Sequence, residues 1–196
     1  MKKQQKKLID ICVWSAVLLF VIRCVVSWND VIAGLSLYEL FGYASEAISV
    51  AVIFSGIYEK FLWRFIPFEK TPKLAKSYEG TLKSNYDNTE RKASLEIKQT
   101  LLSVHITLVT EESKSKSISS SIDDVLGEMQ LTYCYLNTPK AEYRKRSEIH
   151  YGTATLSISD PKSLEGQYYT DRATSGDMVF VAKKIKCGRG QTTSTL

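Results

Sequence analysis

The 196-residue chain has a net charge of +5 and a mean hydropathy of −0.14, but these averages hide a sharp division along its length. The first 60 residues hold two apolar runs, whereas the remaining part, roughly 135 residues, is polar and long enough for one compact domain. The four cysteines are isolated and lack metal-ligand spacing, which excludes a cysteine-built metal site and indicates a reducing compartment.

The two apolar runs, 8–28 and 40–58, predict a transmembrane hairpin within residues 1–63. Each run is about as long as the roughly 20 residues that a helix needs to cross a hydrocarbon core. A cleaved signal peptide is excluded because the first run is too long, no small-x-small site follows it, and a second run comes directly after.

Basic residues flank the hairpin on one side only. Four lysines precede the first run, and the connector 29–39 has no lysine or arginine. After the second run come Lys60, Arg64, Lys70, Lys73 and Lys76. By the positive-inside rule, both termini and the whole domain after Trp63 are expected in the cytoplasm.

Two ionisable residues lie inside the predicted spans at matching depths. Arg23 is five residues before Trp28 and Glu46 is six after Leu40, which places both roughly 8 to 9 Å below the same membrane face. Either Arg23 snorkels while Glu46 is shallow or protonated, or the two residues pair within or between hairpins. On the second interpretation the second span is an oligomerisation surface, whose small residues for close helix approach include Gly42, Ser49 and Gly56.

Residues 64–76 contain two prolines within six residues, Pro67 and Pro72, and predict an extended linker. From 77 to 186 the pattern becomes alternating and rich in β-branched and aromatic residues, and residues 187–196 are expected to be a disordered tail. Eight short strands are predicted: Ser77–Tyr86, Lys92–Thr100, Leu102–Glu111, Ser115–Asp123, Glu128–Asn137, Ser147–Ser159, Leu164–Asp171 and Asp177–Ile185.

Alternation in these strands separates an inner face, with Leu102, Val104, Ile106 and Leu108, from an outer face with His105. No helical segment remains to cover the sheet. We therefore predict a membrane-anchored all-β protein, in which the transmembrane hairpin precedes an eight-stranded antiparallel up-and-down β-barrel. A barrel of that size can hold one small ligand. A two-sheet sandwich remains the alternative, because strand number alone does not separate the two folds.

The expected inner face carries more hydroxyl groups than core filling needs. Tyrosine offers a stacking face with a polar tip, and arginine can grip a phosphate with two hydrogen bonds, so the combination suits a nucleotide-like ligand. Arg172 is the strongest candidate because it shares a face with Tyr168, whereas the basic connection 140–146 also fits a solvated loop or one that touches anionic lipid. The candidate ligand-binding residues are Tyr78, Ser84, Tyr86, Tyr133, Tyr135, Tyr151, Tyr168, Thr170, Arg172 and Arg144.

Glycines inside two predicted strands, Gly80 and Gly166, indicate bending or the close approach of a ligand or a neighbouring strand.

Catalytic patterns are missing from the sequence. It has two histidines, neither with a cysteine or carboxylate at ligand spacing, and no glycine-rich phosphate loop or nucleophile elbow. We therefore expect a receptor rather than an enzyme, without a cofactor or metal.

The order of elements, together with the strand motifs Gly-Thr-Ala-Thr-Leu at 152–156 and Leu-Glu-Gly-x-Tyr-x-Thr-x-Arg at 164–172, resembles the two-transmembrane, β-strand-rich effectors of CBASS anti-phage systems. The resemblance covers nearly the whole chain. It implies a barrel that binds a cyclic dinucleotide made by a partner nucleotidyltransferase, and no DNA or RNA polymer as partner. It further implies that ligand assembles the protomers into a homo-oligomer that disrupts the lipid of the bacterial inner membrane and kills the infected cell.

Two other classes of protein stay open at this point. One is a membrane-tethered, lipocalin-like barrel that binds an apolar or lipid ligand, and the other is a ligand-free structural interaction module. The lining of the barrel discriminates between them. Arginine and tyrosine would favour a nucleotide, an aliphatic lining would favour a lipid, and a filled interior would favour the module.

Overall fold

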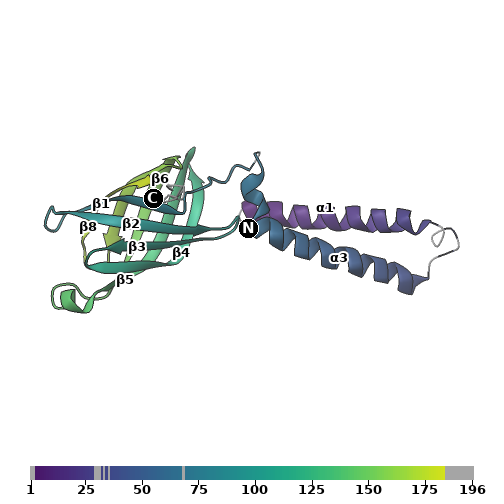
Figure 1. The fold of residues 1–196 in the computed structure, drawn as a ribbon, viewed down its shortest axis with the longest axis horizontal. Helices are drawn as coiled ribbons and strands as arrows, with labels where there is room; N and C mark the ends of the chain where they lie inside the picture. The colour runs from purple at the N-terminus through teal and green to yellow at the C-terminus, as the bar shows by residue number, and fades with distance from the viewer. Residues whose placement is uncertain (1–2, 29–31, 33, 35, 68, 184–196) are drawn as a thin grey trace, which may run out of the picture. The chain divides into compact units, whose positions relative to one another are not determined.

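The computed structural model describes residues 3–28, 32, 34, 36–67 and 69–183 (Figure 1). The chain divides into two compact units. One contains Met1–Thr71 with Thr100–Ser103, and the other contains Pro72–Gln99 with Val104–Leu196. The tail predicted at 187–196 lies outside the described residues.

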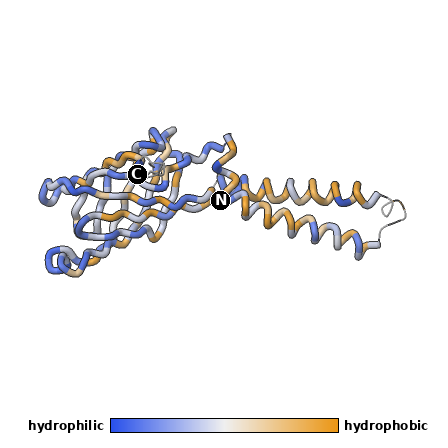
Figure 2. Tube along the Cα trace, in the orientation of Figure 1, coloured by the Kyte–Doolittle hydropathy of each residue, from blue (hydrophilic) through white to orange (hydrophobic). Residues whose placement is uncertain are grey.

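The first unit is built on two helices, α1 (Lys3–Val26) and α3 (Leu37–Lys60). Both are long and apolar enough to cross a membrane, and Figure 2 shows apolar residues along most of their length. The prediction of two apolar N-terminal helices is thus confirmed. Helix α3 begins at a capping box, in which the Glu39 N–H donates to the Ser36 hydroxyl and the Ser36 N–H donates to the Glu39 carboxylate at 2.9 Å.

One face of α3 packs against α1 and is made of small residues and one tyrosine. Ala47, Ala51, Ser55 and Tyr58 are buried, at spacings of three and four residues that place them on one helix face. The Ser55 hydroxyl donates to the Ala51 carbonyl at 2.8 Å, so this buried polar group is satisfied within its own helix. Small side chains at this interface let the two helices approach closely.

The base of the hairpin is held by a buried cluster and an ion pair. Tyr58, Trp63 and Leu101 pack together, Trp63 coming from the short helix η1 (Leu62–Phe65). The Lys7 ammonium lies 2.7 Å from the carboxylate of Glu69, whose side chain is only 4% exposed. Glu69, within the predicted linker, is therefore tied to the first turns of α1.

The second unit is a closed antiparallel barrel in which the strands pair in chain order and β1 also pairs with β8. The prediction of an eight-stranded up-and-down barrel is confirmed, and the sandwich alternative is excluded by the β1–β8 ladder. The strands are β1 (Ser77–Ser84), β2 (Glu90–Gln99), β3 (Val104–Thr110), β4 (Ser113–Val125), β5 (Glu128–Pro139), β6 (His150–Asp160), β7 (Ser163–Thr170) and β8 (Ser175–Ala182).

The predicted inner face of β3 is buried at Val104, Ile106 and Leu108, while His105 is exposed as expected. Leu102 is the exception, because it belongs to the β2–β3 connection and is 41% exposed. The two strand glycines meet neighbouring backbone rather than a ligand. A Cβ at Gly80 would lie 2.8 Å from the Cα of Phe180, and one at Gly166 would lie 2.9 Å from the Cα of Leu156.

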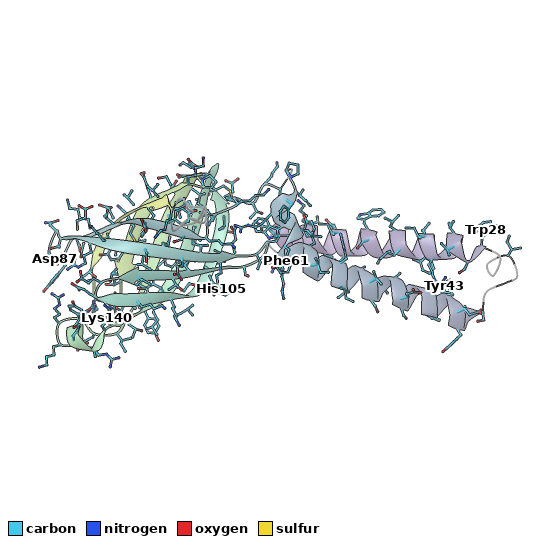
Figure 3. All side chains as sticks on the ribbon, viewed as in Figure 1. Trp28, Tyr43, Phe61, Asp87, His105 and Lys140 are labelled. Atoms are coloured by element: carbon cyan, nitrogen blue, oxygen red, sulfur yellow. The ribbon has the colours of Figure 1, made fainter. Side chains whose placement is uncertain are left out.

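The meander places every connection from an odd to an even strand at the same end of the barrel. Figure 3 shows this for Asp87, in the β1–β2 connection, and Lys140, in the β5–β6 connection. The packed core fills the opposite half of the interior, with its largest fully buried side chains near the starts of odd strands and the ends of even ones. These include Tyr78, Leu131, Leu164 and Phe180.

The ladder between β3 and β4 is short. Backbone pairing covers Thr107–Val109, and β4 shifts register between Ser117 and Ser119. Beyond the ladder, serine side chains of β4 form hydrogen bonds to the backbone of β3 in place of backbone pairing. The Ile106 N–H donates to the Ser117 hydroxyl at 2.9 Å, and the Ser120 hydroxyl donates to the Val104 carbonyl. The serine-rich sequence of β4 thus satisfies backbone groups that a bulged strand would leave unpaired.

Replacing Ser117 by alanine should destabilise the barrel by about 1–3 kcal/mol, because the Ile106 N–H would be left buried without an acceptor. Chemical unfolding of a fragment spanning residues 71–186, followed by far-ultraviolet circular dichroism, measures this loss. Ser119→Ala, at an exposed position of the same strand, is the matched control. Equal midpoints for the two variants would show that the serine does not support the seam.

Candidate functional site

The barrel interior contains a cavity of ≈ 650 Å³ near the odd-to-even end. Here the inner face changes from leucine and isoleucine to hydroxyl, amide and charged side chains. Leu82, Leu108 and Met178 supply apolar lining, while the strand ends and connections supply the polar groups. A ligand pocket commonly has about 300–1,000 Å³, so the space suits a molecule of drug or dinucleotide size.

One wall of the cavity is a polar row that crosses three strands. Ser115 of β4 pairs with Asn137 of β5, which pairs with His150 of β6. All three are less than 9% exposed. The Ser115 hydroxyl donates to the Asn137 Oδ1 at 2.8 Å, and the His150 Nδ1 lies 2.9 Å from the Glu148 carbonyl oxygen. Buried polar groups held in this way can present hydrogen bonds of defined direction to a ligand.

Two tyrosine rings line the cavity, and each lies over a glycine of the neighbouring strand. Tyr135 is paired with Gly152, and Tyr168 is paired with Gly176. A Cβ at Gly176 would lie 2.7 Å from Cε1 of Tyr168, and a Cβ at Gly152 would overlap the phenol end of Tyr135. The glycines therefore leave the space that the two rings occupy next to the neighbouring strands. Rings held in this way are ready-made stacking faces.

Burial raises the pKa of the Tyr135 hydroxyl well above its usual value near 10, and the neighbouring Tyr168 and Asp171 act in the same direction, while Arg172 opposes them. Burial also raises the pKa of Tyr133, whose hydroxyl has no hydrogen-bond partner within the described part of the chain. Both phenols are therefore neutral at physiological pH, and Tyr135 can donate a hydrogen bond into the cavity.

Three arginines line the cavity, and two of them are bound to carboxylates. Arg91 donates to Asp87, and this hydrogen bond is the main cause that holds the pKa of Asp87 far below its usual range. The Glu112 Oε1 lies 2.5 Å from Arg146 Nη2 and 3.9 Å from Arg91 Nε. Arg172 has no carboxylate partner among the described residues, and its Nη2 is 3.4 Å from the Ser147 hydroxyl. It is the guanidinium most available to an anion.

The structure brings six of the sequence-predicted residues to the cavity: Ser84, Tyr86, Tyr135, Tyr168, Thr170 and Arg172. The other four lie elsewhere. Tyr78 and Tyr133 share the inner face but belong to the packed core, Tyr78 donating to the Pro161 carbonyl at 2.6 Å. Tyr151 is 58% exposed on the outer face of β6, and Arg144 is an exposed residue directly after the short helix η2 (Ala141–Tyr143).

Sequence reasoning missed several residues of the cavity, including all of the charged ones except Arg172. Asp87 and Arg91 flank the β1–β2 turn, Glu112 lies between β3 and β4, and Arg146 lies between β5 and β6. They are far apart in the sequence. The signal that could have found them is topological, because an up-and-down barrel gathers all its odd-to-even connections at one mouth.

Comparison with known proteins agrees with this arrangement. Residues 69–182 match the family model described as Cap15, cyclic dinucleotide receptor domain. The chain is also 33% identical over 190 residues to the CD-NTase-associated protein 15 of Staphylococcus schleiferi, a match that covers 91% of this chain and 96% of that protein.

Because its pKa is raised, Tyr135 should stay protonated in the folded protein at a pH where ordinary tyrosines ionise. Stability from the neutral phenol is fully present below pH about 10 and is lost as the pH rises further, because the unfolded chain releases this proton first. The phenolate absorbance of the wild type and of Tyr135→Phe should therefore coincide up to pH about 10 while both stay folded. Lower absorbance of the variant at that pH would contradict the prediction.

Proposed function

The chain belongs to the Cap15 family of cyclic dinucleotide receptors, and from this premise we propose that the cavity described above is the place where the ligand binds. The protein is a CBASS effector, as the sequence resemblance predicted. On the present proposal, the ligand drives membrane-anchored protomers to assemble, and the assembled hairpins disrupt the membrane.

The observation that carries the proposal is the joint presence around one cavity of Tyr135, Tyr168 and Arg172, which has no carboxylate partner among the described residues. A cyclic dinucleotide has two bases and two phosphodiesters. Tyrosine rings in the lining supply stacking surfaces for bases, and a guanidinium supplies two parallel donors to a phosphate. The polar row of Ser115, Asn137 and His150 adds hydrogen bonds for the base edges.

The same lining argues against the two other classes. A lipid-binding barrel would be lined by aliphatic side chains, whereas here three arginines and two carboxylates reach the cavity. A purely structural module would have a filled interior, whereas ≈ 650 Å³ is open. Because the relative in Staphylococcus schleiferi is described as CD-NTase-associated, we further propose that a partner nucleotidyltransferase supplies the ligand.

The membrane part of the proposal follows from charge and helix faces. The basic residues that precede the first helix and follow the second favour an inner-membrane topology with both termini in the cytoplasm, where the ligand is made. Gly42, Ser49 and Gly56 are seven residues apart, and a Cβ at either glycine would meet no atom within 4 Å. This row is therefore free to meet a second hairpin at close range.

Arg23 and Glu46 form a polar cluster within the hairpin. The Arg23 Nε lies 3.2 Å from the Glu46 carboxylate, and the guanidinium also donates to Ser27 and lies 4.5 Å over the ring of Tyr43. Even so, 60% of the Glu46 side chain stays exposed. An ionisable group exposed to hydrocarbon is costly, so a neighbouring hairpin that covers it would stabilise the assembly.

Binding is tested by calorimetric titration of the detergent-solubilised full-length protein with a panel of cyclic dinucleotides. We expect one member of the panel to bind, and Arg172→Ala to weaken its binding roughly ten- to hundredfold, because a charged hydrogen-bond donor is lost. Arg144→Ala removes the same charge outside the cavity and is the control. Equal losses in both variants would move the site away from Arg172.

The membrane step is tested by toxicity in cells that express the protein with its nucleotidyltransferase. Arg23→Gln and Glu46→Gln should each reduce ligand-dependent killing, because each leaves one partner of the cluster uncompensated in the membrane. The charge-exchanged double variant, Arg23→Glu with Glu46→Arg, should restore part of it. Glu59→Gln, at the end of the same helix, is the control. Full killing by both single variants would refute the role of the pair.

A further inference from the structure

Glu112 holds the two arginines at the mouth of the cavity. It lies between β3 and β4, and its side chain is 29% exposed. Its Oε1 oxygen lies close to both Arg146 and Arg91, at 2.5 Å and 3.9 Å, so a single carboxylate oxygen faces two guanidinium groups, one from the β5–β6 connection and one from the start of β2. An anionic oxygen between two guanidinium groups is the arrangement that a bound phosphate oxygen would also adopt.

The arginines of the cavity are thereby divided into two kinds. Arg91 and Arg146 carry carboxylate partners before any ligand arrives, Asp87 being the second partner of Arg91. Arg172 carries none among the described residues. A ligand phosphate can therefore bind to Arg172 directly, but it can reach the Arg91–Arg146 pair only by displacing Glu112 or by approaching it against like-charge repulsion.

We propose that Glu112 is an internal competitor for phosphate and thereby a specificity-determining residue of the cavity. This inference rests on the proposed function. A ligand with two phosphodiesters places one at Arg172, and the binding energy of the remaining molecule brings the second phosphodiester to Arg91 and Arg146 in place of Glu112. A linear dinucleotide with one phosphodiester binds at Arg172 alone and leaves Glu112 in place, so Glu112 sets how much a ligand gains from a second phosphodiester.

Removing the charge of Glu112 has two opposing effects. It ends the competition for the two arginines, but it also removes the contact that keeps them near one another. Ion pairs at exposed positions stabilise a structure only weakly, whereas a carboxylate and a phosphate that share one partner repel each other at close range. The first effect should therefore be the larger, and the variant should bind the cyclic ligand more tightly and favour it more strongly over the linear one.

The test compares Glu112→Gln with Glu111→Gln in the full-length, detergent-solubilised protein. Glu111 is the adjacent residue, is exposed and does not line the cavity, so it controls for the change in net charge. The probes are 3′,3′-cyclic di-AMP, cyclic di-GMP, cyclic GMP-AMP and cyclic di-UMP, each with the linear dinucleoside monophosphate of the same bases. Circular dichroism establishes that both variants remain folded.

For the cyclic probe that binds the wild type, Glu112→Gln should lower Kd roughly tenfold, whereas Kd of its linear counterpart should change little, so the selectivity for the cyclic probe rises. Glu111→Gln should change neither value. Weaker binding of the cyclic probe by Glu112→Gln would mean that the carboxylate accepts a hydrogen bond from the ligand, and unchanged selectivity would also overturn the inference. Both results would leave the proposed function standing, whereas a folded wild type that binds no cyclic probe removes the two together.

Discussion

Closure of the sheet is the constraint on which the rest of the second unit depends. Once β8 pairs with β1, no strand edge is exposed, and the interior of an eight-stranded barrel is just wide enough to be filled by side chains or to hold one small ligand. This barrel does both. Leucine, isoleucine and phenylalanine fill one half, whereas serine, threonine and asparagine at the other half leave space open. The site is thus a local change in side-chain size along strands that otherwise continue unchanged.

The architecture could be predicted because three features of the sequence determine it. The apolar runs of the first 60 residues are long and unbroken, the later strands alternate, and no amphipathic helix remains to cover a sheet. Boundaries differ by a few residues. β1 ends at Ser84 rather than Tyr86, and β4 extends to Val125, because the twist and the bulge at Ser117 are decided by pairing across strands.

The candidate site could be predicted only in part, and the reason is geometric. Alternation tells which face of a strand a residue occupies but not how far along the barrel axis it lies. Tyr133 and Tyr135 share the inner face of β5, yet one is sealed in the core and the other lines the cavity. The paired charges of the cavity come from three separate parts of the chain, namely Asp87 with Arg91, Glu112, and Arg146. Only the strand order brings these parts together.

The two units solve the same electrostatic problem in different surroundings. In each, a guanidinium is paired with a carboxylate across elements: Arg146 with Glu112 at the cavity mouth, and Arg23 with Glu46 between the helices. Both pairs are partly exposed, so neither satisfies its carboxylate completely. In water, such a pair costs little to open, which suits exchange for a ligand phosphate. Hydrocarbon would not solvate the exposed part of Glu46, so covering it with another protein surface would be favourable. On the proposed function, the same chemistry favours ligand exchange in one unit and association in the other.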